Sequence, residues 1–295
     1  MNYPDRACII EVGPRDGFQN LAVAVATPEK LALIAEIVRA GVTAVEVTSF
    51  PAPREIPQLA DGETVLRAVK DHHRDKVRCI VSAMSCEGAA AAAGLGADTV
   101  SYIVSAGDKH HQQLTCQSPA QSLAGFAAFC RLKSGARARL SISAAFASPH
   151  DGQTAPAAVL RLLEAGLRAG ADEFNLADTT GTANPLQTMA LLREVAANFA
   201  GVPVTLHFHD TQGMGLANVF SAFSLGFASF EASVGGLGGN PLRPLAAGNI
   251  ATEDVVNMFA AMGVATGIDP VPLIAAARNL RAALPVNLSG HLINT

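Results

Sequence analysis

The 295-residue chain contains 49% hydrophobic and 16% charged residues, a composition typical of a folded globular protein that excludes a disordered or fibrous one. Its 21 basic and 25 acidic residues give a formal net charge of −4, and the basic residues are scattered, so no nucleic-acid partner is expected. The apolar stretches are interrupted by glycine or polar residues before they reach the ~18 residues of a membrane helix. No membrane partner is therefore expected either.

The cysteines are odd in number and lack the paired spacing of metal ligands. The N-terminal segment does not show the basic and then apolar pattern of a secretion signal. Both features predict a reduced, cytoplasmic protein. The five cysteines are Cys8, Cys79, Cys86, Cys116 and Cys130.

Short segments rich in β-branched residues alternate with longer segments rich in alanine and leucine, which is the pattern of repeated βα units. The predicted strands are Ala7 to Val12, Ala44 to Thr48, Val77 to Ser82, Thr99 to Val104, Arg139 to Phe146, Glu173 to Ala177, Val204 to His209 and Ser229 to Val234. The predicted helices between them include Thr27 to Gly41, Ser118 to Gly135, Thr154 to Gly170 and Asn184 to Ala200. Further helices are expected after Gly267.

Eight such units over roughly 250 residues match the size of a (β/α)₈ or TIM barrel. We therefore predict an α/β fold in which residues 1–295 form a single barrel domain with additional C-terminal helices. The alternative is a doubly wound open sheet, which usually carries a glycine-rich phosphate turn after its first strand. Here the first turn, Gly13 to Gly17, is charged instead, which favours the barrel.

Two histidines near the end of the seventh predicted strand are the strongest local signal. His207 and His209 are two residues apart on a strand, so they point to one face and can present two imidazoles to one metal. Asp16 follows another strand end and adds a carboxylate. Mixed nitrogen and oxygen ligands favour an octahedral divalent cation such as Mg²⁺ or Mn²⁺. The alternative is that one histidine is a satisfied core residue and the other lies in a loop.

Arg15 and Glu46 are expected at the same rim of the barrel. A guanidinium beside a metal can hold a carboxylate or a developing enolate oxygen, although Arg15 can also be an ordinary surface ion-pair residue. Glu46 lies in an apolar run, either as an inward residue that pairs with Arg15 or as one that also sets the charge around the metal.

The glycine-rich stretch from Gly235 to Gly239 is predicted to be a mobile flap, because ordering so many glycines is entropically costly unless closure over a ligand is useful. Asn249 precedes a helix start at Thr252. On the sequence alone, Asn249 is interpreted as a turn or helix-cap residue.

Five segments of the chain resemble 3-hydroxy-3-methylglutaryl-CoA lyase, a member of the metal-dependent lyases and synthases on (β/α)₈ barrels that also include isopropylmalate synthase. The segments occur in the family order and span nearly the whole chain. The length resembles the lyases and not the longer synthases. The segments are EVGPRDGFQN (residues 11–20), VEVTSF (45–50), NLADTTG (175–181), HFHDTQGMGLAN (207–218) and GGLGGNPLRPLAAGNIATEDVV (235–256).

The resemblance implies roles for particular residues. The aspartate of the RDG motif, the two histidines of the HxH motif and the asparagine of the GN motif bind the divalent cation in that family. Carried over, these are Asp16, His207, His209 and Asn249. Arg15 is implied to stabilise an enolate, and Glu46 and Asp178 are implied to be neighbouring active-site acids.

The implied reaction is a retro-aldol cleavage of a 3-hydroxyacyl-CoA, which gives acetyl-CoA and a keto acid. An alcohol proton is hard to remove at neutral pH, and a divalent cation lowers the pKa of a bound oxygen by about nine units in the case of water on zinc. The implied partners are an acyl-CoA substrate and a second copy of the chain in a homodimer.

One departure from the family concerns its glycine loop, which ends in a cysteine that is implied to carry a proton. Asn240 occupies that position here, and an amide forms hydrogen bonds but does not titrate near pH 7. The candidate proton carriers in its place are Cys116, His150 and Asp178. The alternatives to a lyase are a condensing synthase that runs the reverse aldol or Claisen reaction, and a homologue that binds metal and acyl-CoA without cleaving it.

Overall fold

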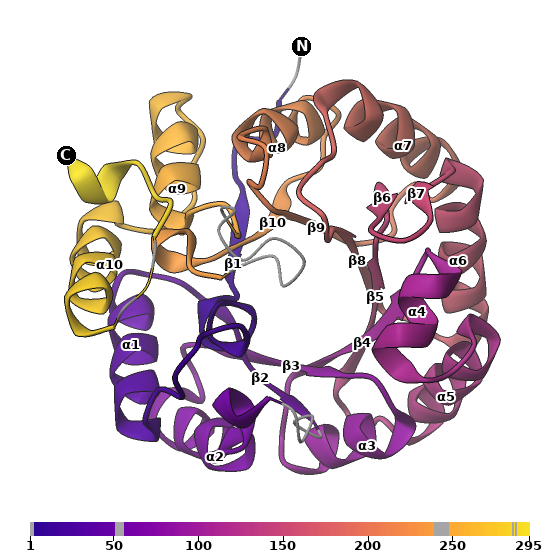
Figure 1. Cartoon of the computed structure of the whole chain (residues 1–295), viewed down its shortest axis with the longest axis horizontal. Helices are drawn as coiled ribbons and strands as arrows, with labels where there is room; N and C mark the ends of the chain where they lie inside the picture. The colour runs from indigo at the N-terminus through magenta and orange to yellow at the C-terminus, as the bar shows by residue number, and fades with distance from the viewer. Residues whose placement is uncertain (1–2, 51–55, 239–247, 285, 287) are drawn as a thin grey trace.

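A computed structural model describes residues 3–50, 56–238, 248–284, 286 and 288–295. Eight parallel strands close into a barrel in the order β1-β10-β9-β8-β5-β4-β3-β2, and helices surround it (Figure 1). The predicted TIM barrel is confirmed. The barrel strands are β1 (Cys8–Glu11), β2 (Ala44–Phe50), β3 (Arg78–Ala83), β4 (Thr99–Ser105), β5 (Arg137–Ser143), β8 (Glu173–Asp178), β9 (Val204–Phe208) and β10 (Ser229–Ala232).

The helices begin at the signals that the sequence carries. Ser118 and Asn184 form capping boxes with the glutamines three residues later, and a proline occupies the first turn of both helices that they cap. No helix in the described part of the chain is long and apolar enough to cross a membrane. The helices are α1 (Thr27–Arg39), α2 (Gly62–His73), α3 (Cys86–Gly94), α4 (Asp108–Thr115), α5 (Pro119–Leu132), α6 (Pro156–Ala169), α7 (Pro185–Asn198), α8 (Gly215–Phe223), α9 (Thr252–Ala261) and α10 (Pro270–Ala283).

The two faces of the barrel strands have different surroundings. On β8, Phe174 and Leu176 are fully buried, and Phe174 packs against Gly166 of α6, where an added Cβ would lie 2.6 Å from the ring. The alternate residues Asn175 and Ala177 instead line a cavity inside the barrel. Because side chains alternate along a strand, the outer residues form the core beneath the helices and the inner residues are free to carry chemistry.

The fifth strand is shorter than predicted at its C-terminal end. It ends at Ser143 because Ala144 adopts a positive φ of 52°, which a strand does not accommodate. The chain then forms a small hairpin of β6 (Ala147–Ser148) and β7 (Gly152–Gln153) that the sequence did not predict. This hairpin projects over the C-terminal rim of the barrel (Figure 1).

The described part of the predicted flap is packed into the protein. Gly235 and Gly236 are buried in the short helix η3 (Val234–Gly236), each with a φ of +68°, and Leu237 is 1% exposed. These glycines serve left-handed backbone turns and close packing, because an added Cβ on Gly236 would lie 2.3 Å from the Ser289 hydroxyl. Gly239 and Asn240 lie outside the described residues.

A buried carboxyl group beside this turn makes stability depend on pH. Glu253 of α9 is 0% exposed, its Oε2 accepts a hydrogen bond from the Gly235 amide, and burial raises its pKa to about 7. A raised pKa means that the folded state favours the protonated carboxyl group. The stability that this protonation contributes is fully present below pH 4.5 and is lost as the pH rises through 7.

We expect Glu253→Gln to be more stable than the parent protein at pH 8, by ~2 kcal/mol, because glutamine is neutral at every pH. At pH 4.5 the two proteins should have nearly the same free energy of unfolding. Urea denaturation at the two pH values measures the difference. A stability difference that is the same at both would show that ionisation of Glu253 is not its cause.

Candidate functional site

Two charged residues follow β1 on a single turn of π-helix, η1 (Gly13–Gly17). The carbonyl of Val12 accepts the amides of Arg15, Asp16 and Gly17 at 3.1, 2.7 and 3.3 Å, which folds the chain tightly over the end of the strand. Gly17 is needed for this packing, since an added Cβ would lie 2.9 Å from Leu237. The turn therefore places Arg15 and Asp16 at the mouth of the barrel, as predicted.

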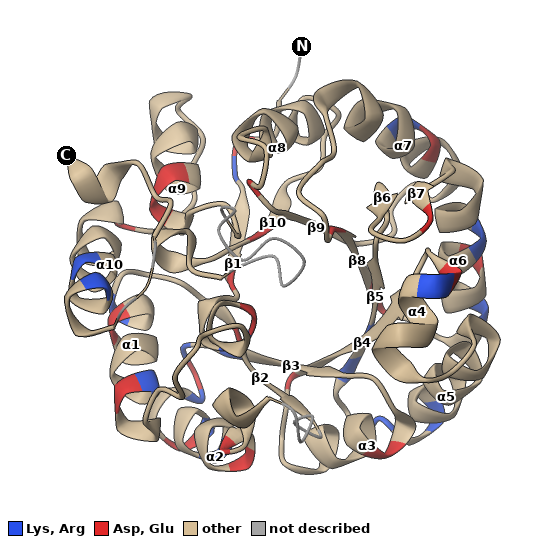
Figure 2. Ribbon diagram, viewed as in Figure 1, with Lys and Arg blue, Asp and Glu red and all other residues tan. Residues whose placement is uncertain are grey.

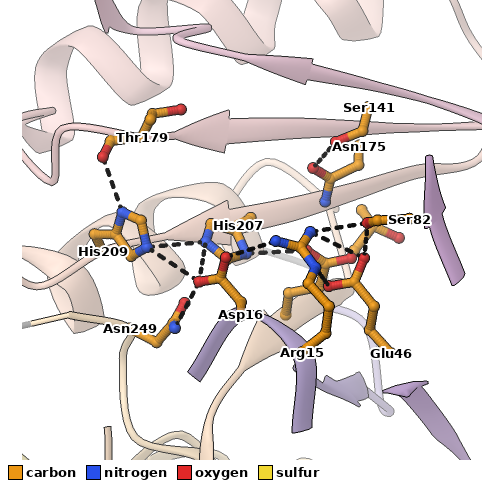
Figure 3. Close-up of polar contacts among 12 residues, drawn as sticks. Arg15, Asp16, Glu46, Ser82, Ser141, Asn175, Thr179, His207, His209 and Asn249 are labelled. Carbon is orange, nitrogen blue, oxygen red and sulfur yellow. Dashed lines mark hydrogen bonds and ion pairs between the residues drawn. The ribbon is translucent and has the colours of Figure 1, made fainter. Parts of the chain in front are cut away.

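Asp16, His207 and His209 come together as a buried cluster in which one ligand atom of each lies within 4.8 Å of the others. The Nε2 atoms of the two imidazoles are 3.3 Å apart. Asp16 Oδ2 lies 3.6 Å from Nε2 of His209 and 4.0 Å from Nε2 of His207 (Figure 3). Two nitrogens and one carboxylate oxygen thus face a common point.

The outer nitrogen of each imidazole has an acceptor that fixes the tautomer. His207 Nδ1 lies 2.9 Å from Glu231 Oε2, and His209 Nδ1 lies 3.0 Å from the Thr179 carbonyl. Because these partners accept hydrogen bonds, the neutral rings carry their protons on Nδ1 and direct two Nε2 lone pairs at each other. A cation between the rings would satisfy both lone pairs, so the donor set fits a metal ion.

Asn249 lies against the same point. It is 0% exposed, and its Nδ2 donates to Asp16 Oδ2 at 2.9 Å and to the Leu237 carbonyl at 3.0 Å. Its Oδ1 is buried and has no hydrogen-bond partner within the described residues. A buried acceptor without a partner is unfavourable, and an amide oxygen is a ligand that hard divalent cations accept. Asn249 is therefore next to the cluster with an unused acceptor, and it is not the cap of the helix that follows, because the N-cap of α9 is Ala251.

The guanidinium of Arg15 is fixed from three sides. Nη1 donates to Asp16 Oδ1 at 2.8 Å, and Nη2 donates to the Ser82 hydroxyl at 2.9 Å. Glu46 lies 2.8 Å from Nε and accepts from Nη2 at 3.0 Å. Hydrogen bonds thus engage three of the five N–H donors of this arginine, and one N–H on Nη1 is left over. Nε is ion-paired with Glu46 Oε2 but has no hydrogen-bond partner within the described residues.

Opposite charges decide the ionisation of Asp16. Burial opposes its ionisation, but the charge of Arg15 holds the pKa of this carboxyl well below its usual range. Burial raises the pKa of Glu46 although Arg15 opposes this. Asp16 is consequently an anion at neutral pH, which is the form that binds cations.

A chain of buried charged side chains starts at the Nδ1 side of His207. Glu231 pairs in register with His207 across β10 and β9, and its second oxygen accepts from Arg139 Nη1 at 2.8 Å. Arg139 is 0% exposed and donates in turn to Glu173 at 2.8 Å. Figure 2 shows that acidic and basic residues lie on the barrel strands as well as on the surrounding helices. A charged residue within the apolar run of β10 was the sequence signal for Glu231, and it was missed.

Asp178 is not among the described residues that line the cavity, and its implied role as a neighbouring active-site acid stays a prediction. Its carboxylate accepts the amides of Thr182 at 3.3 Å and Ala183 at 3.1 Å, and burial raises its pKa. It is the residue that folds the loop after β8. That loop carries Thr179, whose carbonyl accepts from His209 and whose hydroxyl accepts the Ala144 amide at 2.8 Å.

A cavity of about 290 Å³ opens beside the metal-ligand cluster. Its lining includes Arg15, Asp16, His207 and His209, and also His110 of α4, which was not predicted to lie at the site. His110 is half-buried and its Nδ1 lies 2.8 Å from the Ser105 hydroxyl. Burial, and then the nearby His150, lower its pKa, so that the neutral form able to accept a proton predominates at pH 7.

The candidate proton carriers differ in position. Cys116 is exposed at the C-terminus of α4, where its φ of 56° ends the helix, and it does not line the cavity. His150 is exposed on the β6–β7 hairpin, and its ring centroid is 6.4 Å from that of His110. Asn240, which replaces the family cysteine, lies outside the described residues.

The arrangement of Asp16, His207 and His209 at the C-terminal rim can be compared with known proteins. A model of the HMGL-like family matches residues 6–280. The chain belongs to this family. It is an HMG-CoA lyase-like carbon–carbon lyase, with relatives that are aligned over nearly their whole length.

The similar HMGL-like proteins have two kinds of named substrate. (R)-citramalyl-CoA lyase of Chloroflexus aurantiacus is 37% identical, covering 94% of this chain and 90% of that protein. Hydroxymethylglutaryl-CoA lyase YngG of Bacillus subtilis is 35% identical, covering 94% and 93%. An HMG-CoA lyase from Acinetobacter baumannii, solved with coenzyme A and 3-methylmalate, is 34% identical with a TM-score of 0.94, covering 100% of this chain and 96% of that one.

Proposed function

We propose that this protein cleaves a 3-hydroxy-3-methylacyl-CoA that carries a free carboxylate, such as 3-hydroxy-3-methylglutaryl-CoA or citramalyl-CoA, into acetyl-CoA and a keto acid. The hydroxyl proton leaves, the C3–O bond becomes a carbonyl, and the C2–C3 bond breaks. Its electron pair forms the enolate of acetyl-CoA, which a proton then quenches at C2. The observation that supports this most is the convergence of Asp16, His207 and His209 on the cavity that Arg15 also lines.

Asp16, His207, His209 and Asn249 are the residues that we propose to hold a divalent cation, Mg²⁺ or Mn²⁺. Such a cation, when bound, lowers the pKa of a hydroxyl that it contacts and stabilises negative charge on oxygen. Glu231 and the Thr179 carbonyl support this site by holding the two imidazoles in the required tautomer.

Arg15 is the residue that we propose to face the thioester oxygen. Glu46 and Ser82 fix the plane of its guanidinium, so that the remaining Nη1 donor and the positive charge need no reorganisation when the enolate forms. Preorganised donors of this kind stabilise a transition state more than they stabilise the ground state. The roles of Arg15 and Glu46 are thus electrostatic, and neither residue has to exchange a proton.

The proposal predicts acetyl-CoA release that depends on a divalent cation. Purified protein is incubated with Mg²⁺ or Mn²⁺ and separately with 3-hydroxy-3-methylglutaryl-CoA and citramalyl-CoA, and acetyl-CoA and the keto acid are quantified by mass spectrometry. We expect equal amounts of the two products from the better substrate, and loss of product when EDTA is added.

A reversed assay separates the lyase from a condensing synthase. Enzyme is mixed with acetyl-CoA and a keto acid, and free thiol is measured. If CoA is released from acetyl-CoA and the keto acid faster than acetyl-CoA is formed from the hydroxyacyl-CoA substrates, the protein is not a lyase. Bound metal together with no reaction in either direction would favour a non-catalytic homologue.

A further inference from the structure

A polar group on the floor of the cavity has no role in the cluster described above. Asn175 is on the inner face of β8, lines the cavity, and is 2% exposed. Its Oδ1 accepts a hydrogen bond from the Ser141 hydroxyl at 3.0 Å, which sets the orientation of the amide. Its Nδ2 is buried and has no hydrogen-bond partner within the part of the chain that the structure describes.

The amide nitrogen faces the cavity on the side away from Ser141. Figure 3 shows it on the side turned toward Arg15 and away from Ser141. Buried donors are nearly always satisfied, so an unsatisfied donor that lines a ligand cavity indicates an acceptor on the ligand. The partner that this position calls for is an oxygen atom.

The charged residues around the cavity indicate which group of the ligand carries the oxygen that accepts from Asn175. Among the described lining residues, Arg15 is the only guanidinium, and there is no lysine. Arg15 is already paired with Asp16 and Glu46. Among the described lining residues, a carboxylate on the acyl chain therefore finds no unpaired cationic side chain, and neutral donors are the side-chain groups left to bind it.

We infer that Asn175 Nδ2 donates a hydrogen bond to the carboxylate at the end of the acyl chain remote from the thioester, and that it makes the enzyme selective for a carboxylated acyl chain. This inference rests on the proposed function. Ser141 is a positioning residue in this arrangement, because its hydroxyl holds the Asn175 amide so that the nitrogen and not the oxygen faces the ligand. A site built to bind a polar group rejects the analogue that lacks it.

The kinetic test compares two thioesters, 3-hydroxy-3-methylglutaryl-CoA and 3-hydroxy-3-methylbutyryl-CoA, which has hydrogen in place of the carboxylate. For Asn175→Ala we expect kcat/KM to fall about 10- to 100-fold with the carboxylated substrate, mainly through KM, and to change less than about threefold with the other. For Asn175→Asp, kcat/KM with the carboxylated substrate should fall further than for Asn175→Ala, because two carboxylates then face each other.

The matched control is Thr205→Val. Thr205 is the neighbour of Asn175 in register on β9 and is also buried, but it is not among the residues that line the cavity. Thr205→Val should change kcat/KM by the same factor with both substrates. Equal losses with both thioesters in Asn175→Ala, or no loss with either, would overturn the inference.

A binding measurement keeps the inference testable if no thioester is cleaved. Calorimetry with Mn²⁺-saturated protein compares 3-hydroxy-3-methylglutarate with 3-hydroxy-3-methylbutyrate. The parent protein should bind the first about 10-fold or more tightly than the second, and Asn175→Ala should bind both alike. A preference that survives in Asn175→Ala would overturn the inference, whereas lack of cleavage by the parent protein would count against the proposed function alone.

Discussion

Replacing His209 by alanine is expected to lower kcat/KM by about 1,000-fold or more, because metal-derived charge stabilisation is worth several kcal/mol. The Nε2 of His209 is 3.3 Å from that of His207 and 3.6 Å from Asp16 Oδ2, so removing it leaves two of the three clustered ligands. Calorimetric titration with Mn²⁺ should show weakened binding in the same variant. The replacement Glu231→Gln, which leaves all ligands in place, should have a smaller effect of about 10- to 100-fold.

His72→Ala provides the control, because His72 is an exposed histidine on α2 away from the cavity. It should bind Mn²⁺ as tightly as the parent protein. If His209→Ala retained both the affinity for Mn²⁺ and the activity, the assignment of the metal ligands would be wrong.

Replacing Arg15 by methionine is expected to lower kcat about 100- to 1,000-fold with a smaller change in KM, since its proposed contact strengthens as the enolate forms. Arg15→Lys keeps the charge but not the planar set of donors that Glu46 and Ser82 hold. It should therefore recover only a minor part of the lost rate. Steady-state kinetics on the better of the two thioesters gives both constants.

Arg67→Met is the matched control for this experiment. Arg67 forms an exposed ion pair with Glu63 on α2, where both side chains are more than half exposed. Its loss should leave kcat unchanged. A purely structural role for Arg15 would instead lower the melting temperature together with the activity, so thermal unfolding of each variant is measured alongside.

The barrel could be predicted because its strands are short, β-branched and regularly spaced. The end of β5 could not, since Ala144 adopts a positive φ that a non-glycine residue rarely takes, and it does so where Thr179 from a different βα unit accepts its amide. The burial of the turn at Gly235, in the stretch predicted to be a mobile flap, could not be predicted either. Its glycines allow close packing. A glycine-rich sequence suits a closely packed turn and a mobile loop equally well, so the sequence alone does not distinguish the two.

Like the fold, the site could be predicted only in part from the sequence. The spacing of His207 and His209 predicted that both point inward, and the structure brings Asp16 to them. Asp178 is absent from the cavity lining because the alternation along β8 turns it to the other face from Asn175 and Ala177. Asn175 and His110 were missed because a polar residue in a strand or on a helix has no distinctive pattern until the fold brings it to a cavity.

The pairing of β1 with β10 joins the two ends of the ring. Asp16 follows the first of these strands and Asn249 follows the second, so the two side chains meet only when this pair of strands closes the ring. A nascent or partly folded chain consequently has no complete ligand set. Any cation held by both residues favours the sealed ring over the open one, so that uptake of the ion and completion of folding are a single coupled equilibrium.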